Sequence, residues 1–563
     1  MLAALGPLLQ ALGTESHPPP LFLTPTNADL LIRGGRVFTV DHAMPWAEAI
    51  AVSDGRISWV GSDADAPHAR ETIDARGRLV LPGFVDAHNH VRLGAVGSAV
   101  PLAGARSLEE IRGRVAAFAR EHPEEDWIEG EGWNYSAIPG GIPTAADLEG
   151  ITQGKPAFLF SYDVHTVWMN REALSRLGIV KGSGDVPFGR VSRDTDGEPT
   201  GFLTDFAVMG LSREGQAALE GVLPSFSADR RYERLLESLD MAARFGITTV
   251  VEPQNSVDDL PLFARARDGG ALRSRLIAAL FHPPGTTEDD LDAFEEARRT
   301  YGDDRLRVGP IKLYIDDVIE PHTAAMLEPY ANRADELGHL FWDPGAFADL
   351  IARLERRGFQ TFTHATGDRG IRTALDAVQH ARAVNGPRDA RHQIVHVECV
   401  HPDDLPRFAE LGVVACMQPR HAAPEIVGEW RENVGPSRWP SAFPWRSLHD
   451  AGATLAFSSD WNVAEMDPMV GIYTALTRAS LDGAERWTPE QRLDLATTIR
   501  AYTLGGAYAN FAEADRGSIT VGKHADIVIV SHDLFALEDP RAVLDARVEL
   551  TMVGGEVVAA AER

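Results

Sequence analysis

His88 and His90 stand two residues apart at the end of an apolar segment, residues 79–85, which has the character of a β-strand. Side chains two positions apart on a strand point to the same side, so the two imidazoles would project together. Two imidazoles on one side suit a borderline metal ion such as zinc. The alternative is a pair of polar histidines that bind no ion.

Three further polar residues end separate apolar segments. These residues are His364, His396 and Asp460. Each of them alone is more typical of an ordinary loop or core position. Four strand ends that carry His-x-His, His, His and Asp together instead predict a metal site, because such sites form where nitrogen and oxygen ligands converge.

Lys312 lies inside another apolar segment, residues 309–316. A lysine at such a position costs free energy unless it is paired or modified. One interpretation is a salt bridge. The other is carboxylation by CO₂, which would convert the amine into a carbamate able to bridge two metal ions, and the sequence leaves both open.

Eight strand-like segments that alternate with helical stretches must position these residues. They are residues 83–90, 246–252, 274–282, 309–316, 359–365, 392–398, 412–419 and 453–460. This alternation predicts an α/β fold with a (β/α)₈ TIM-type barrel over residues 81–510. The carboxyl ends of barrel strands form the face on which active sites are built, so the candidate ligands would share one rim.

The rest of the chain predicts two additions to the barrel. Residues 28–80 and 511–563 are both β-rich, and they predict one small domain built from the two chain ends. The stretch between the first two barrel strands is too long for a normal connection, so an inserted subdomain is expected at about residues 92–240. Residues 1–27 are interpreted as a tail.

Composition limits the classes of partner. The 563 residues carry a formal net charge of −28, which disfavours nucleic acid and anionic membrane surfaces. The two cysteines, Cys399 and Cys416, are too few for a disulfide framework. The chain has no basic leader with a long apolar core and no apolar run of membrane-spanning length, so we expect a cytoplasmic protein without membrane or nucleic-acid partners.

The motifs LPGFVDAHNH, IKLY, THATGD, RHQIVHVE, MQPRH and LAFSSDW resemble the amidohydrolase superfamily. The resemblance is closest to the branch of YtcJ-like hydrolases and N-substituted formamide deformylases, and it extends from about Asp29 onward. It implies a β-sandwich built from both chain ends and an insertion after the first barrel strand. Asp316-Asp317 and Ser458-Ser459-Asp460 depart from the Asp-Gly and Gly-Ser-Asp that are frequent in this branch.

The resemblance also implies a ligand set for one or two divalent ions, expected to be Zn²⁺. His88 and His90 would bind the more buried metal with Asp460, while His364 and His396 would bind the second. A carboxylated Lys312 would bridge the two ions. A homodimer is a further expectation from the family.

Asp460 and His421 are the expected catalytic groups. Bound zinc lowers the pKa of a water from 15.7 to roughly 7, and Asp460 would shuttle the proton of this water to the leaving nitrogen. His421 would donate to the oxyanion, or else it only supports its neighbours.

Expected substrate contacts come from three places. Trp133, Tyr135, His165 and Trp168 lie in the insertion and could roof the barrel mouth, which would suit an apolar or aromatic small molecule. The alternative for the two tryptophans is the core of the insertion itself. Glu252 is either a substrate contact or a buried partner of an Arg or His. Arg420 either pairs with a substrate carboxylate or forms a structural ion pair.

The expected function is metal-dependent hydrolysis of a non-peptide C–N bond in an amide, formamide, N-acyl compound or carbamate. Deamination and ester or lactone hydrolysis are alternatives, because the fold does not decide between them. A non-catalytic scaffold is the least favoured hypothesis, since the chain retains the full expected ligand set.

Overall fold

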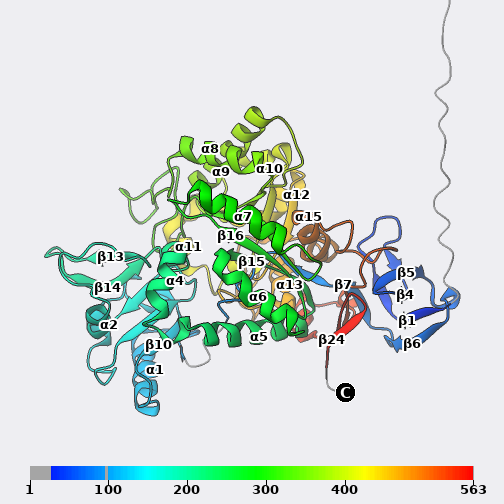
Figure 1. The fold of residues 1–563 in the computed structure, drawn as a ribbon, viewed down its shortest axis with the longest axis horizontal. Helices are drawn as coiled ribbons and strands as arrows, with labels where there is room; N and C mark the ends of the chain where they lie inside the picture. The colour runs from blue at the N-terminus through cyan, green and yellow to red at the C-terminus, as the bar shows by residue number, and fades with distance from the viewer. Residues whose placement is uncertain (1–26, 95–98, 562–563) are drawn as a thin grey trace, which may run out of the picture.

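A barrel of eight parallel strands forms the centre of the computed structural model, which describes residues 27–94 and 99–561 (Figure 1). The strands are β8 (Phe84–Asp86), β15 (Ile247–Asn255), β16 (Arg275–Phe281), β17 (Leu306–Tyr314), β18 (Thr361–Ala365), β19 (Gln393–His396), β20 (Val414–Met417) and β21 (Thr454–Phe457). Each strand pairs with its neighbours in chain order. The predicted TIM-type barrel is therefore confirmed.

The first and last strands approach each other at their carboxyl ends. The amide of Ala87 donates to the carbonyl of Phe457 at 3.4 Å, and the amide of Asp460 donates to the carbonyl of His88 at 2.9 Å. The interior of the barrel is packed with small and branched side chains, among them Ala87, Ile277 and Cys416. This packing fills the barrel below the candidate ligands, so the ligand-bearing ends form a rim over a solid core.

Helices surround the barrel and extend into the insertion. Long helices around the barrel are α5 (Ala228–Arg244), α7 (Glu288–Thr300), α8 (Pro344–Arg356) and α9 (Asp368–Asn385). Shorter ones are α3 (Phe206–Met209), α4 (Arg213–Glu220), α6 (Leu260–Asp268), α10 (Leu405–Leu411), α11 (Gly428–Val434), α12 (Trp445–Asp450), α13 (Pro468–Thr477), α14 (Leu495–Arg500) and α15 (Gly506–Ala509). Within the described ranges, none of the helices combines the length and the apolar character needed to cross a membrane.

The segment after the first barrel strand folds around a sheet of its own. Its strands are β9 (Val100–Pro101), β10 (Ile128–Trp133), β11 (Ala157–Ser161), β12 (Val167–Met169), β13 (Arg190–Arg193) and β14 (Pro199–Thr204), and helices α1 (Leu108–Glu121) and α2 (Arg171–Arg176) accompany them. Helix α5 then returns the chain to the barrel, where it packs against β15. The inserted sheet lies to one side of the barrel in Figure 1.

Strands from both chain ends build a β-sandwich on the other side of the barrel (Figure 1). One sheet contains β1 (Ala28–Arg33), β4 (Ala49–Ser53), β5 (Arg56–Gly61) and β6 (Ala69–Asp74). The other contains β2 (Arg36–Phe38), β3 (Trp46–Ala47), β7 (Leu79–Pro82), β22 (Ile527–Val530), β23 (Val548–Val553) and β24 (Glu556–Ala560). Strand β7 pairs with β22 and leads directly into β8, so this domain anchors the first ligand strand.

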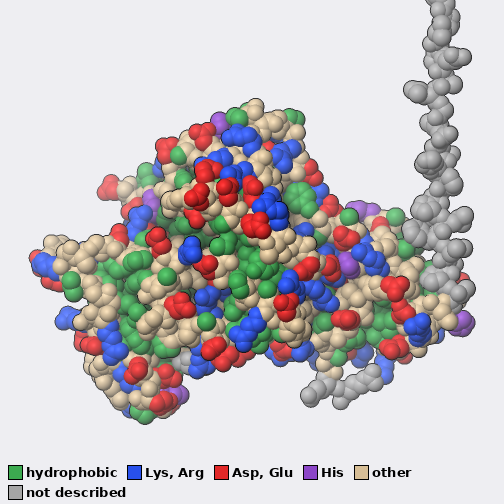
Figure 2. All heavy atoms as spheres, viewed as in Figure 1, with side chains coloured by type: hydrophobic (Ala, Val, Ile, Leu, Met, Phe, Trp, Pro, Cys, Tyr) green, Lys and Arg blue, Asp and Glu red, His purple; other side chains and the backbone are tan. Residues whose placement is uncertain are grey.

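Residues 1–26 of the expected tail lie outside the described residues. On the described surface, acidic and basic side chains are interspersed over the face that Figure 2 shows. The net charge of −28 therefore does not gather into a single acidic patch on that face.

Candidate active site

Asp86 ties the ends of the first and last barrel strands together. Its carboxylate accepts hydrogen bonds from the hydroxyl and the amide of Ser459 at 2.6 and 3.0 Å, and from the side-chain amide of Asn89 at 2.9 Å. Burial raises the pKa of Asp86 to about 6, although these hydrogen bonds favour the carboxylate. The network fixes the two segments that carry His88 and Asp460.

The carboxylate of Asp460 lies against both histidines of the His-x-His pair. Its Oδ1 is 3.2 Å from Nε2 of His88 and 3.3 Å from Nε2 of His90, and the two Nε2 atoms are 3.3 Å apart. All three side chains are buried. Two imidazole nitrogens and a carboxylate oxygen thus share one small space, as a zinc ion would require of its ligands.

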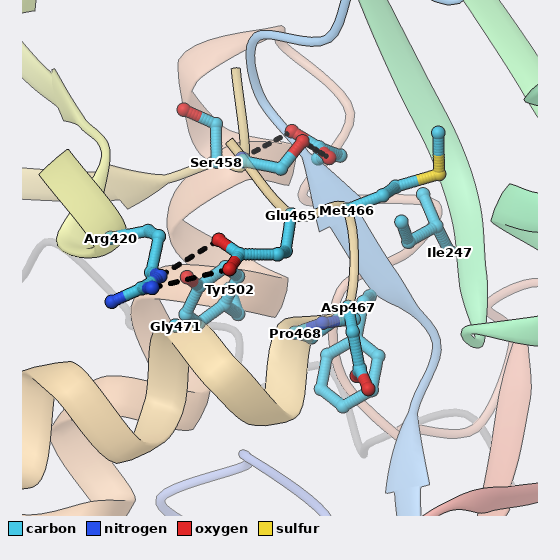
Figure 3. Close-up of a pocket in the computed structure, with 12 residues that line it drawn as sticks. Ile247, Arg420, Ser458, Glu465, Met466, Asp467, Pro468, Gly471 and Tyr502 are labelled. Atoms are coloured by element: carbon cyan, nitrogen blue, oxygen red, sulfur yellow. Dashed lines mark hydrogen bonds and ion pairs between the residues drawn. The ribbon is translucent and has the colours of Figure 1, made fainter. Parts of the chain in front are cut away.

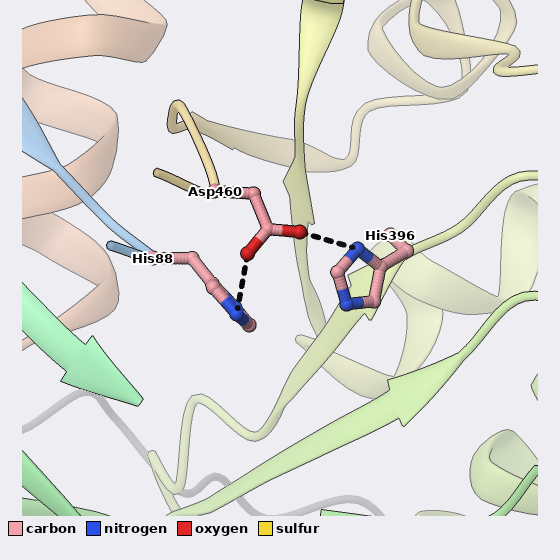
Figure 4. Close-up of side chains that lie close together, drawn as sticks. All are labelled: His88, His396 and Asp460. Atoms are coloured by element: carbon pink, nitrogen blue, oxygen red, sulfur yellow. Dashed lines mark ion pairs between the residues drawn. The ribbon is translucent and has the colours of Figure 1, made fainter. Parts of the chain in front are cut away.

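His396 extends this group from the sixth barrel strand. Its Nδ1 lies 3.8 Å from Oδ2 of Asp460, and Figure 4 shows His88 and His396 on the two sides of that carboxylate. The ring of His364 follows, with its centroid 4.5 Å from that of His396. The five side chains expected to bind metal therefore lie in one connected cluster.

Lys312 reaches the cluster from the fourth barrel strand. Its amine is fully buried, makes no hydrogen bond, and lies 4.6 Å from the centre of the Tyr314 ring. Burial lowers the pKa of Lys312 to about 7. No carboxylate pairs with this amine within the described residues, so the salt-bridge interpretation has no partner in the structure.

The protonation states of the cluster suit a cation. Burial lowers the pKa of His88 to about 3, and it lowers the pKa of His364 and His396 well below the ordinary value. Burial by itself raises the pKa of Asp460, but the surrounding histidines hold this pKa well below its usual range. Neutral imidazoles and an ionised carboxylate are the forms that bind metal.

Two of the candidate ligands have a left-handed backbone conformation. His396 has a φ of 75° and Asp460 has a φ of 58°. Such a conformation costs a non-glycine residue on the order of 1–3 kcal/mol and is concentrated at functional sites. The chain turns sharply at both residues, which directs their side chains toward the rim.

His421 completes the rim above Asp460. Its Nε2 is 3.5 Å from Oδ2 of Asp460, and its Nδ1 is 3.7 Å from Oε1 of Glu398. Burial lowers the pKa of His421, but Glu398 and Asp460 outweigh this effect and raise it above its ordinary value. The ring is therefore placed to carry and donate a proton beside Asp460.

Two adjoining cavities open over the cluster. One, of about 30 Å³, is lined by His364, His396 and His421, and the other, of about 20 Å³, is lined by His88 and His90. Asp460 lines both cavities. The space beside the candidate ligands is thus large enough for a water molecule or two in this structure.

Comparison with known proteins identifies the fold family. The model of the amidohydrolase family matches residues 71–559, which is most of the chain. The chain belongs to the amidohydrolase family. Its relatives include the Arabidopsis thaliana protein LONG AFTER FAR-RED 3, which is 29% identical over 94% of this chain and 91% of the relative.

Two bacterial relatives lie in the branch that the motifs resemble. A protein named as a YtcJ amidohydrolase from Bacillus subtilis is 26% identical over 93% of this chain and 98% of its own. The N-substituted formamide deformylase of Arthrobacter pascens is 27% identical over 90% and 94%. Among solved structures, an uncharacterized metal-dependent hydrolase from Pyrococcus furiosus superposes with a TM-score of 0.66 at 25% identity, over 90% of this chain and 99% of that one.

The donor atoms of this amidohydrolase fit a metal ion. Several buried polar atoms around the rim have no hydrogen-bond partner among the described residues: His88 Nδ1, His90 Nδ1, Lys312 Nζ, His364 Nδ1, His421 Nε2 and Asp460 Oδ1. Leaving a buried polar atom unpaired is costly, roughly 1–3 kcal/mol each. Coordination would satisfy part of this set, because His88, His396 and Asp460 each present a ligand atom within 4.8 Å of the others.

His165 reaches the rim of the amidohydrolase site from the insertion. Its Nδ1 contacts the carboxylate of Asp317, and its ring centroid is 5.4 Å from that of His364. Burial lowers the pKa of His165, but Asp317 and Asp163 outweigh it and raise the pKa to about 9. This side chain lines both cavities, at the position expected for a substrate contact.

The other aromatic residues expected at the mouth lie deeper in the insertion. Trp133 and Trp168 are fully buried, and their indole nitrogens donate to the carbonyls of Leu159 and Thr144. The structure thus places both tryptophans in the core of the inserted subdomain, which was the alternative to a position over the barrel mouth. Tyr135 is also buried, and its hydroxyl donates to Asp163, which lines both cavities.

Glu252 and Arg420 are occupied by partners within the protein. Oε2 of Glu252 accepts the amide of Arg92 at 2.9 Å, and Oε1 lies 4.0 Å from Nδ1 of His90. Arg420 pairs with Glu465 at 2.7 Å and Glu425 at 2.8 Å, and Figure 3 shows the pair with Glu465. For both residues the structure therefore shows the alternative that the sequence left open, a supporting or structural role.

Four residues at the site were not predicted from the sequence. They are Asp163, Asp317, Glu398 and Gln418. Gln418 accepts from Nδ1 of His396 at 2.9 Å, which leaves Nε2 of that ring free to bind an ion. The position of Glu398, two residues after His396, could have indicated a site residue from the sequence. For Gln418 the sequence gave no indication apart from its position at the end of β20.

Proposed function

We propose that this amidohydrolase cleaves a non-peptide C–N bond in a small amide, formamide, N-acyl or carbamate substrate. The observation that carries the proposal is the convergence of His88, His90, His364, His396 and Asp460, with Lys312, on one buried rim. Family membership supports hydrolysis, and the similarity to a formamide deformylase supports the choice of bond.

The proposed metal ligands divide into two sets. His88, His90 and Asp460 would hold one divalent ion, and His364 and His396 would hold a second, with the carbamate of Lys312 between them. Nitrogen and oxygen donors of this kind suit Zn²⁺. When bound, the ion would supply Lewis acidity toward the carbonyl oxygen and lower the pKa of a water at the site.

Asp460 is the proposed proton carrier. Its Oδ2 faces the cavity beside His421 and can accept a proton from the attacking water. The same oxygen can return that proton to the departing nitrogen, which is required because an amide anion is a poor leaving group. His421, held by Glu398, would donate to the oxygen on which negative charge develops.

The test is metal analysis of the purified full chain, followed by assays on matched formamides, acetamides, carbamates, esters and amino-heterocycles. We expect one or two equivalents of zinc or another divalent ion and release of an amine from at least one of the C–N substrates. Turnover confined to esters or to deamination would contradict the proposed bond. The absence of any stoichiometric metal would favour a scaffold.

A further inference from the structure

A second, larger pocket lies between the inserted sheet and the barrel mouth. Its volume is about 220 Å³, several times that of either cavity over the candidate ligands. Its walls come from both parts of the protein: Phe160 on β11 and Phe226 before α5 on one side, and Leu93 and Trp461 after the ligand strands on the other. The metal centre does not use this pocket.

The pocket adjoins the cavity over the metal ligands. Leu93, Val164, Leu211 and Asn462 line the pocket and also line the cavity that contains His88, His90 and Asp460. Trp461 and Asn462 directly follow Asp460 in the chain. A ligand in this pocket would therefore be separated from the metal ligands by a single layer of side chains.

Val164 forms the boundary between the two spaces. It stands between Asp163 and His165 with a φ of 62°, a conformation that a β-branched residue rarely adopts. Strained backbone of this kind persists where the surrounding structure holds it, and it is concentrated at ligand sites. The side chain of Val164 lines both the pocket and the cavity.

The remaining wall of the pocket is apolar and aromatic, with a few polar atoms that lack partners. Phe160, Phe206 and Phe226 supply most of the aromatic surface. Buried atoms of four lining residues have no hydrogen-bond partner in the part of the chain that the structure describes: Ser225 Oγ, Arg234 Nη2, Trp461 Nε1 and Asn462 Oδ1. Such a wall suits an apolar group that carries one or two polar atoms.

Charge in the wall favours an uncharged ligand. Arg234 donates to the carbonyl of Leu93 at 3.0 Å, so part of its guanidinium is engaged in the wall itself. Glu129 and Glu131 lie close enough to offset its charge, and Glu131 lines the pocket. A carboxylate ligand would gain little here, because it would meet these acidic neighbours as well as the arginine.

We propose that this pocket binds the apolar, uncharged substituent of the amide substrate and so selects substrates with a bulky aromatic or branched group. The inference rests on the proposed function for the bond that is cleaved, but binding in the pocket can be measured without turnover. Phe160, Phe206 and Trp461 would contact the substituent, and Val164 would set the distance between it and the scissile bond.

The experiment measures binding and hydrolysis separately on the full chain. Titration calorimetry compares N-(2-naphthylmethyl)acetamide, its ring-carboxylated analogue and N-methylacetamide. We expect the uncharged naphthyl amide to bind at least about tenfold more tightly than the other two, because burial of one aromatic group contributes more than 1.4 kcal/mol. Equal affinity for the naphthyl and methyl amides, or tighter binding of the carboxylate, would overturn the proposal.

Two variants fill the pocket from opposite ends. Val164→Phe adds bulk at the junction, and Ala103→Phe adds it at an exposed position on the rim. Each should weaken binding of the naphthyl amide about tenfold. Ala103→Phe should also leave the affinity for N-methylacetamide unchanged, because Ala103 lines the pocket but not the cavities over the candidate ligands. Val180→Phe, at an exposed site elsewhere in the insertion, is the matched control and should change neither affinity. Unaltered naphthyl affinity in both pocket variants would reject the site.

The two proposals can fail independently. Tight, Val164-dependent binding without amine release would leave the pocket in place and contradict C–N hydrolysis. Hydrolysis of small and bulky amides with equal KM would support C–N hydrolysis and contradict the proposed role of the pocket.

Discussion

At the scale of single residues, the sequence largely predicted where the candidate ligands lie in the fold. The expected histidine and aspartate ligands lie at the barrel rim, because each lies at or just after the carboxyl end of a buried strand, whereas Lys312 lies within β17. The orientation of the histidine rings was not predictable from the sequence. The rotation of His396 depends on Gln418, and that of His421 depends on Glu398, both of which are contacts between different strand ends.

Asp460→Asn tests the proton carrier. The amide retains one oxygen that can face His88 and His90, so the variant should keep its fold and at least one metal. It cannot accept a proton at neutral pH, and turnover should fall by about 10²–10⁴-fold. Metal content and kcat measured on the same preparation decide the question, and near-normal kcat would refute the role.

Lys312→Met tests the role of the buried amine. Methionine fills a similar volume and removes a polar atom that makes no hydrogen bond, so the thermal midpoint of the metal-free protein should stay level or rise. Metal content should drop by up to one equivalent if the lysine holds an ion as its carbamate. A lower midpoint with unchanged metal content would instead show a purely structural lysine.

At the scale of elements, the barrel strands were predictable and the inserted sheet was not. The barrel strands are buried on both faces, and so they appear in the sequence as continuous apolar runs such as that of β16. In the insertion, β10 and β11 pair in parallel while β11 and β12 pair antiparallel. No periodicity in the sequence says which face of such a mixed sheet meets the barrel, so the positions of Trp133 and Trp168 stayed open.

Ser459→Ala tests the link between β8 and β21. The substitution removes the 2.6 Å hydrogen bond to Asp86, which is buried and charged, and should cost about 1.5–3 kcal/mol. It should also loosen the segment that carries Asp460 and weaken metal affinity, measured by competition with a chelator. Ser62→Ala, which removes an exposed Ser–Asp hydrogen bond of the same length to Asp65, is the control and should leave both readouts unchanged.

At the scale of the whole molecule, the two chain ends meet in one sandwich that buttresses the barrel. Composition alone predicted that the two β-rich ends associate, and the pairing of β7 with β22 shows how they do so. The connection between the sandwich and the barrel was not predictable. Arg275 at the start of β16 meets Asp526 just before β22 in a buried, bidentate ion pair with distances of 3.0 and 3.1 Å.

Asp526→Asn tests this connection. Removal of one partner leaves the Arg275 charge buried, with only the partly exposed Asp304 beside it, and breaking a buried pair typically costs about 3–5 kcal/mol. Asp63→Asn breaks an exposed Arg33–Asp63 pair in the same sandwich and is the matched control, with little change expected because solvent screens that pair. The thermal midpoint should fall by several degrees in Asp526→Asn alone. The metal content and kcat of the protein that remains folded should stay at the wild-type level, because the pair lies at the end of the barrel opposite the ligands. Equal midpoints in the two variants would show that the sandwich does not depend on this pair for its attachment.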